Sequence, residues 1–170
     1  MYRLIKLYFD IAILRKGPQD TPTSIWLLRV LISIYITLNV LVMLINGYVI
    51  INAFLQIGAD LLIMLGFTWP LLHFSGKRGR FPQTLGALTG TDAIVTSFAL
   101  PILAAQNLLP PEFIFFAMLI LMAWHWIICG HIFRHALDKP IFFGLGLSLL
   151  YILISSQIME LLLPILSPQL

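Results

Sequence analysis

Charged residues are scarce in this sequence. Of its 170 residues, 10% are Asp, Glu, Lys or Arg, whereas ordinary globular domains have about 25%. Hydrophobic residues make up 60%, and the mean hydropathy is +0.99. Such a chain cannot cover a folded core with a polar surface, so a water-soluble globular domain is excluded and an integral membrane protein is predicted. The net charge of +3 is too small and too scattered to indicate nucleic-acid binding.

Cysteine is almost absent. Cys129 is the single cysteine and lies in an apolar run, which excludes a disulfide within the chain. The sequence also lacks a glycine-rich phosphate loop, a haem motif and the Ser, His and Asp order of a hydrolase. We therefore expect a protein that is not an enzyme and that has no cofactor.

Long apolar runs are abundant. Five of them can each cross a hydrocarbon core of about 30 Å, which takes about 20 helical residues. They cover residues 24–46, 49–72, 84–106, 112–134 and 141–163. The sequence thus predicts an all-α, polytopic fold with five transmembrane helices, in which residues 23–165 form one membrane domain and residues 166–170 form a short outer tail.

The N-terminal segment has a different pattern. Residues 1–16 have apolar side chains at helical spacing on one face, namely Leu4, Leu7, Tyr8, Ile11 and Leu14, whereas Arg3, Lys6 and Asp10 share another face. This pattern predicts an amphipathic helix that lies in the membrane interface, and residues 1–22 are expected to form this helix and a linker. A signal peptide is not expected, because Asp10 interrupts the apolar stretch and no small-residue cleavage site follows.

Lys and Arg are distributed unevenly among the connecting segments. They occur in the N-terminal segment and in the loops at 73–83 and 134–140, whereas the turn at 46–48, the loop at 107–111 and the tail after 163 have none. Positive residues gather on the cytoplasmic side of membrane proteins. Five spans therefore predict a cytoplasmic N-terminus and a C-terminus on the outer side.

Polar residues recur inside the predicted spans. Asp60 lies halfway along the second span, where a charge costs about 2.5–3.5 kcal/mol on insertion scales. The other polar residues in the first three spans are Ser33, Thr37 and Asn39, then Asn52, Gln56 and Thr68, and finally Thr89, Asp92 and Thr96. Their spacing predicts that the three helices turn polar faces toward a shared interior. From the helical rise, Asp60 and Asp92 should differ in depth by about 9 Å and should not share a proton.

Three roles are open for these polar residues. They could bond to one another across packed helices, form a path for protons or a substrate, or form a docking surface for a partner. Gly86 and Gly90 form a GxxxG pattern, which allows close approach of a second helix.

Histidine and cysteine are concentrated in the fourth span. His125 and Cys129 are four residues apart, as are His131 and His135. A metal site needs three or four converging ligands, so no metal is expected here. We expect these histidines, with Trp124, Trp126 and Arg134, to form an interfacial belt at the inner end of the span, and we expect Glu160 to be a solvated end group.

Two stretches resemble the bacterial branch of the Yip1 family. GKRGRFPQTLGALTG at 76–90 is similar to the family's basic loop and the start of its third span, and AWHWIICGHIFRHAL at 123–137 is similar to its fourth span. The resemblance implies a five-helix bundle with a cytoplasmic N-terminus, here in a bacterial inner membrane. Eukaryotic members bind prenylated GTPases through a long N-terminal region. The corresponding region of this sequence has only about twenty residues, so no GTPase partner is expected.

Two functional hypotheses follow. In the first, the protein is a non-enzymatic scaffold or accessory subunit that contacts a membrane protein partner or a second copy through Gly86, Gly90 and the amphipathic helix. In the second, it is a small transporter or a component of a proton-coupled permease, in which Asp60 and Asp92 change protonation. An enzyme with a membrane-embedded His and Cys site is a third hypothesis.

Overall fold

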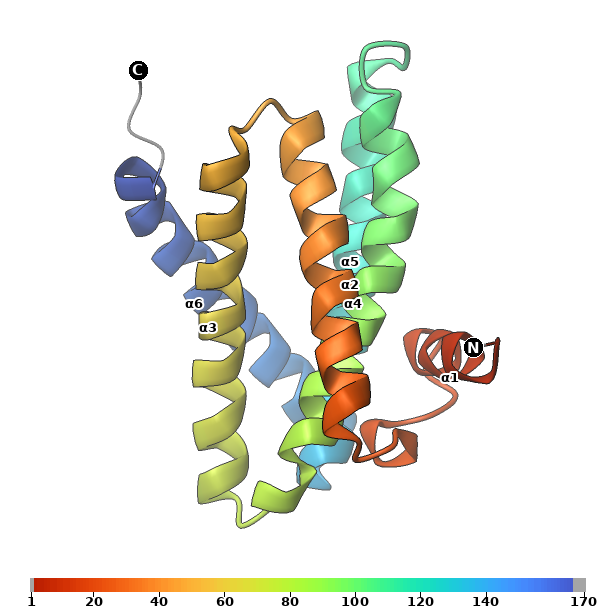
Figure 1. Ribbon diagram of the computed structural model, residues 1–170. Helices are drawn as coiled ribbons and strands as arrows, with labels where there is room; N and C mark the ends of the chain where they lie inside the picture. Colours follow the sequence, from red (N-terminus) through yellow and green to blue (C-terminus); the bar gives the residue numbers. More distant parts are fainter. Residues whose placement is uncertain (1, 167–170) are drawn as a thin grey trace.

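The computed structural model describes residues 2–166, with side chains up to Leu162, and this part of the chain consists of helices and their connections (Figure 1). The helices are α1 (Tyr2–Ala12), η1 (Pro18–Asp20), α2 (Ile25–Ile45), α3 (Ile50–Phe74), η2 (Arg78–Arg80), α4 (Phe81–Ala104), α5 (Pro111–Leu137) and α6 (Ile141–Leu166). The predicted tail at 166–170 falls outside the described residues except for Leu166, which ends α6.

Five helices, α2 to α6, are long and apolar enough to cross a membrane. Each begins and ends within three residues of its predicted span, so the prediction of an all-α polytopic fold is confirmed. The chain reverses between α2 and α3 at Gly47, whose φ of 83° is a left-handed conformation that glycine adopts without strain. The protein is therefore an integral membrane protein.

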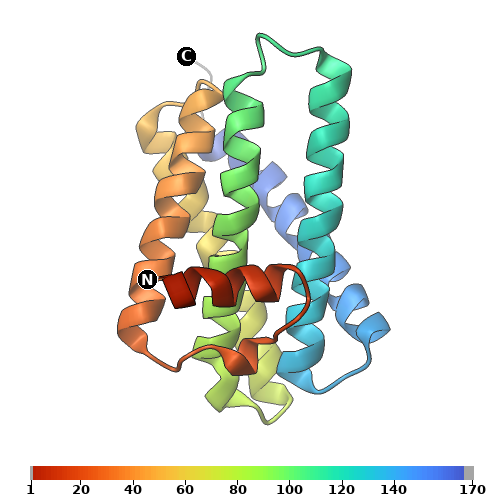
Figure 2. The same cartoon turned by 90° about the vertical axis from the view of Figure 1, so that its right-hand side faces the viewer.

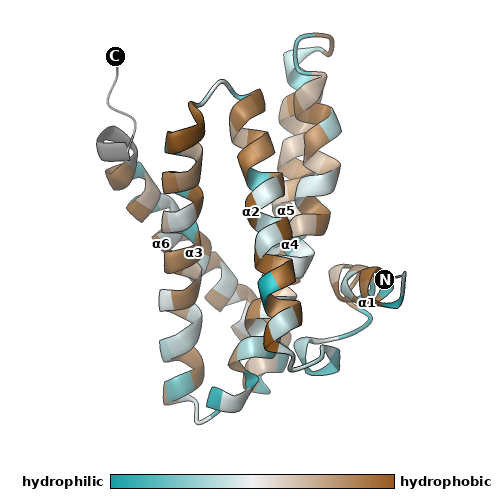
Figure 3. Ribbon diagram, viewed as in Figure 1, coloured by the Kyte–Doolittle hydropathy of each residue, from teal (hydrophilic) through white to brown (hydrophobic). Residues whose placement is uncertain are grey.

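Consecutive long helices run in opposite directions (Figure 1). The α3–α4 and α5–α6 connections lie together at one end of the bundle, which is also its most hydrophilic end (Figure 3). We call this the basic end, because its connections hold Lys77, Arg78, Arg80 and Lys139. Helix α4 is the central helix: 56% of its apolar window is buried, whereas the other four long helices have 17–22%.

Helix α1 lies crosswise over α4 (Figure 2). Its inner face buries Tyr8, Ile11 and Ala12, as an amphipathic helix should. The helix ends at Ala12, earlier than the predicted residue 16, because the chain turns at Leu14 with a φ of 64°. The outer face exposes both Ile5 and charged residues, which is the pattern of a helix in the membrane interface.

Side chains of α5 hold the N-terminal segment in place. Trp124 Nε1 donates a hydrogen bond of 2.9 Å to the Ala12 carbonyl, and His131 Nε2 lies 2.8 Å from the Lys16 carbonyl. Trp126 Nε1 donates to the Leu145 carbonyl of α6 at 3.1 Å. The interfacial belt stays a prediction for these side chains, whose polar groups contact the N-terminal segment and α6. A buried indole N–H needs an acceptor, and the carbonyls at the end of α1 and in the first turns of α6 supply it.

Glycines allow the closest contacts between helices. Gly86 and Gly90 are buried, but the group packed on Gly90 is the Tyr8 ring of α1, because a Cβ built there would lie 2.5 Å from Tyr8 Cδ1. The predicted packing role thus operates within the chain. A second close contact joins α5 and α6, where a Cβ on Gly144 would overlap the carbonyl oxygen of Gly130.

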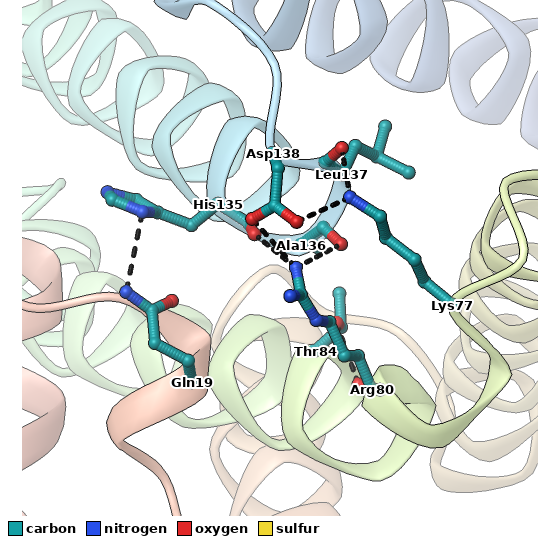
Figure 4. Close-up of polar contacts among 8 residues, drawn as sticks. All are labelled: Gln19, Lys77, Arg80, Thr84, His135, Ala136, Leu137 and Asp138. Atoms are coloured by element: carbon teal, nitrogen blue, oxygen red, sulfur yellow. Dashed lines mark hydrogen bonds and ion pairs between the residues drawn. The ribbon is translucent and has the colours of Figure 1, made fainter.

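The side chains of Lys77 and Arg80 cap the C-terminal end of α5 (Figure 4). The last carbonyls of a helix lack partners within the helix. Lys77 Nζ donates to the Leu137 carbonyl at 2.5 Å and to Asp138 Oδ2 at 2.6 Å, and Arg80 Nη1 donates to the Ala136 carbonyl at 3.2 Å and to Asp138 Oδ1 at 2.9 Å. These hydrogen bonds, from Arg80 first and then Lys77, lower the pKa of Asp138 to about 2.

Alanine at Gly90 tests the contact with Tyr8. Because the added Cβ meets the ring, we expect Gly90→Ala to destabilise the protein by about 1–3 kcal/mol and to expose the Arg15-Lys16 bond to trypsin. Gly58→Ala is the matched control, since a Cβ there meets nothing within 4 Å and should be neutral or stabilising by up to about 1 kcal/mol. Thermal unfolding in detergent measures both. Equal stability of the two variants would contradict the packing role of Gly90.

Acidification tests the ion pairs of Asp138. The pKa is about 2 in the folded protein and about 3.9 in an unfolded chain, so the pairs stabilise the fold above about pH 4 and this contribution is lost as the pH falls through about 2. We expect Asp138→Asn to lower the melting temperature at neutral pH and to flatten its fall at acidic pH. Glu112→Gln, which changes an exposed acid in α5, is the control. Parallel pH profiles for wild type and Asp138→Asn would contradict the assignment.

Candidate functional site

Asp60 is held by hydroxyl groups from two other helices. On α3 it accepts a short hydrogen bond from the Tyr35 hydroxyl of α2 through Oδ2 and one of 3.3 Å from Ser155 Oγ of α6 through Oδ1. Tyr35 is 3% exposed, so its hydroxyl needs this acceptor. Both carboxylate oxygens are therefore bonded to neutral donors.

Asp92 is the centre of a second cluster. On α4 its Oδ2 accepts a hydrogen bond of 3.0 Å from Asn39 Nδ2 of α2 and one of 3.4 Å from Thr96 Oγ1. Its Oδ1 lies 3.7 Å from His125 Nδ1 of α5, which is close enough for an ion pair when the imidazole is protonated. The other ring nitrogen, Nε2, lies 3.4 Å from Cys129 Sγ one turn further along α5.

The two clusters meet on α2. Asn39 Nδ2 also donates to the Tyr35 carbonyl, at 3.0 Å. Since Tyr35 and Asn39 are four residues apart, the contacts of Asp60 and Asp92 with α2 are about 6 Å apart along its axis. Among the described residues, no hydrogen bond joins the two carboxylates directly.

Both carboxylates line one cavity of about 280 Å³. The polar part of its wall also includes His125, Cys129, Tyr151 and Ser155, so that α3, α4, α5 and α6 all contribute. The rest of the wall is mainly apolar, with Met64, Leu88, Met122 and Ile152. Two carboxylates and one imidazole thus line a single small cavity between four of the membrane-spanning helices.

The cavity opens between α5 and α6. Met122 on α5 is 57% exposed, and Ser156 on α6 is exposed. The two helices are tightly packed at the basic end, where Gly144 faces Gly130, and α6 then leans away toward its C-terminal end (Figure 1). The exposed part of the cavity wall therefore lies between α5 and α6, away from the basic end.

This arrangement can bind and release protons. Aspartate and histidine are the side chains that exchange protons most readily, and here they face one another in place of Lys or Arg partners. Charges interact more strongly inside a protein than in bulk water, so the gain of one proton changes the electrostatics of the whole cavity.

The structure brings together only some of the predicted polar residues. Asp60, Asp92, Thr96 and Asn39 belong to the clusters, whereas Thr89 is buried and donates to the Leu85 carbonyl of its own helix at 2.9 Å. The remaining candidates on α3 are Asn52, which is half-buried, and Gln56 and Thr68, which are buried. Gln56 Nε2 and Thr68 Oγ1 have no hydrogen-bond partner among the described residues.

The prediction that Ser33 and Thr37 face the interior is wrong. Both are exposed, and each donates to a carbonyl four residues earlier in α2, at 2.9 and 2.8 Å. The reason is helical geometry, because residues two apart lie on nearly opposite faces. Asn39 points inward, so Thr37 points outward.

Sequence analysis missed several members of the site. These are Tyr35, Tyr151 and Ser155. Tyr35 has helical spacing with the predicted Asn39, and Tyr151 with Ser155, so this spacing could have indicated an inward face on α2 and α6. His125 was expected in a belt at the inner end of its span, but it is half-buried and lines the cavity.

Metal binding has no support in the part of the chain that the structure describes. Within residues 2–166 no group of three or more His, Cys, Asp and Glu side chains could hold a metal ion. The rings of His131 and His135 pack edge to face with their centroids 4.6 Å apart, and neither residue lines the cavity. Glu160 is exposed near the end of α6, as a solvated end group should be.

Comparison with known proteins adds no relative. No family model matches the chain, and neither the curated proteins nor the solved structures include a significant match. The resemblance to the Yip1 family therefore stays a prediction.

Leucine at Asn39 tests the Asp92 cluster. Asn39→Leu removes one donor from a buried carboxylate, so we expect a loss of about 1–3 kcal/mol in stability. The double variant Asn39→Leu/Asp92→Leu should lose less than the sum of the two single variants, because no unpaired carboxylate remains. Asn46→Leu is the control, since Asn46 is exposed and donates only to its own helix. Additive losses in thermal unfolding would contradict the coupling of Asn39 and Asp92.

Proposed function

We propose that this chain is a small transporter or a component of a proton-coupled permease, in which Asp60 and Asp92 bind and release protons. We place it in a bacterial inner membrane, with the basic end and the N-terminus in the cytoplasm and the C-terminus in the periplasm. The observation on which the proposal rests is the single cavity that both carboxylates line together with His125. No enzymatic step is needed for this function.

The energetic cost of the two acids supports the proposal. Each carboxylate at this depth costs a few kcal/mol, and uncharged residues of similar size would pack the same helices without that cost. If the two acids served only to pack the helices, their cavity would not need an opening. The cavity wall nevertheless includes Met122 and Ser156, which are exposed. Acids that face the interior of a membrane domain rather than lipid are typical of proton relays.

The contacts provide a route for a proton between the acids and the imidazole. His125 Nδ1 faces Asp92 Oδ1 at 3.7 Å, so a small approach of the two side chains, or one bridging water, would allow a proton to pass between them. Asp60 borders the same cavity from α3 and is connected to α2 through Tyr35. A proton inside the cavity can therefore bind to either carboxylate.

Part of the contact surface that the scaffold hypothesis proposes is used within the chain. Tyr8 covers Gly90 and contacts Gly86, and the inner face of α1 is used in the same contact. A membrane protein partner or a second copy would have to bind elsewhere on the apolar surface. We therefore rank the proton-coupled function first and the scaffold second.

Proton binding by the purified protein tests the proposed function. We expect wild type to bind up to two more protons than Asp60→Asn/Asp92→Asn as the pH is lowered over a range that includes neutral pH, measured by difference titration in neutral detergent. The infrared carboxyl band should change over the same range in wild type alone. Glu160→Gln is the control, because Glu160 is an exposed acid of α6 outside the cavity wall.

A specific result would contradict the proposal. If the double variant stays folded and its titration curve matches that of wild type, neither acid exchanges protons near neutral pH. If the double variant does not fold, the infrared band of wild type alone decides, and an unchanged band rejects the proposal.

A further inference from the structure

We infer that the cavity binds a small organic monocation with apolar substituents, such as an aromatic quaternary ammonium ion, in exchange for a proton. This inference rests on the proposed function and names its substrate class. It is based on the charge of the cavity, the chemistry of its wall and the position of its opening.

The charge of the wall favours one positive charge. The titratable groups that face the cavity are Asp60, Asp92, His125, Cys129 and Tyr151, from α3 to α6, with Tyr35 of α2 behind Asp60. None of the wall residues in the described chain is Lys or Arg. With both carboxylates ionised and the imidazole protonated, one negative charge remains. One proton or one monocation neutralises it.

The apolar wall selects an organic cation over a metal ion. Met64, Leu88, Met122 and Ile152 offer no oxygen ligands to replace a hydration shell. The carboxylate oxygens of the wall already accept hydrogen bonds, those of Asp60 from Tyr35 and Ser155 and Oδ2 of Asp92 from Asn39 and Thr96. They do suit alkyl or aryl substituents, and the ring of Tyr151 adds a surface that attracts quaternary ammonium groups. A weakly hydrated cation loses little on entering such a space.

The opening gives access to the same class of compound. It lies between α5 and α6 at Met122 and Ser156, where the helices face the bilayer. An amphiphilic cation concentrates in the membrane and can enter from there, whereas a fully hydrated ion cannot. The volume of about 280 Å³ limits the occupant to a small molecule.

Exchange follows from the low dielectric of the site. A proton and an organic cation both neutralise the same charge, and holding both would leave a net positive charge in a desolvated space. Binding of the cation therefore releases a proton. The apparent affinity for the cation should rise with pH, by up to tenfold per pH unit while one proton is displaced.

Benzyltrimethylammonium is the probe, and neopentylbenzene is its uncharged counterpart of the same shape. Titration calorimetry of the wild-type protein in neutral detergent, in two buffers of different ionisation enthalpy, gives the affinity and the number of protons released. We expect the cation to bind at least tenfold more tightly than the neutral compound, with about one proton released. Asp60→Asn and Asp92→Asn should each weaken binding at least tenfold, while Glu160→Gln should not change it.

Each other result overturns the inference. Equal binding of the two probes would mean a purely apolar cavity, and cation binding without proton release would exclude exchange. If the cation does not bind while the difference titration still shows proton uptake by Asp60 and Asp92, the substrate class is wrong and the proposed function stands. If neither is seen, both fail. The comparison of the two probes on wild type decides even if a variant does not fold.

Discussion

The need to keep polar groups paired in a desolvated interior determines how these five helices pack. Asp60 and Asp92 require donors at a depth where water supplies none. Tyr35 and Asn39 meet this need from α2, and Ser155 and His125 meet it from α6 and α5. The two acids thus fix the rotation of the helices around them. Apolar contacts alone would leave that rotation weakly specified, because lipid and helix surfaces are equally apolar.

Small residues set the distances between the same helices. Tyr8 packs directly on the central helix α4 because Gly90 has no side chain, and α5 and α6 approach closely where Gly130 faces Gly144. The close contact of α5 and α6 lies toward the basic end, where Lys77 and Arg80 also bind the end of α5. One end of the bundle is therefore closely tied, and the space between α5 and α6 widens beyond it.

Local patterns predicted what local physics controls. Hydropathy predicted both ends of all five spans to within three residues, because membrane insertion depends on the composition of each segment. The acids of the site were also predicted, since a carboxylate in an apolar run is conspicuous. The rest depends on helix rotation and tilt. Ser33 was placed inside and His125 in an interfacial belt, because one sequence does not show which face a neighbouring helix will cover.

The close contact between Gly130 of α5 and Gly144 of α6 also provides a point about which α6 can rotate. Ser156 lies twelve residues beyond Gly144, or about 18 Å along the helix axis. A rotation of about 10° at this pivot would displace Ser156 by about 3 Å, enough to narrow or widen the mouth beside Met122. A small change of angle at the contact between α5 and α6 would therefore change the width of the cavity opening, even if the other helices did not move.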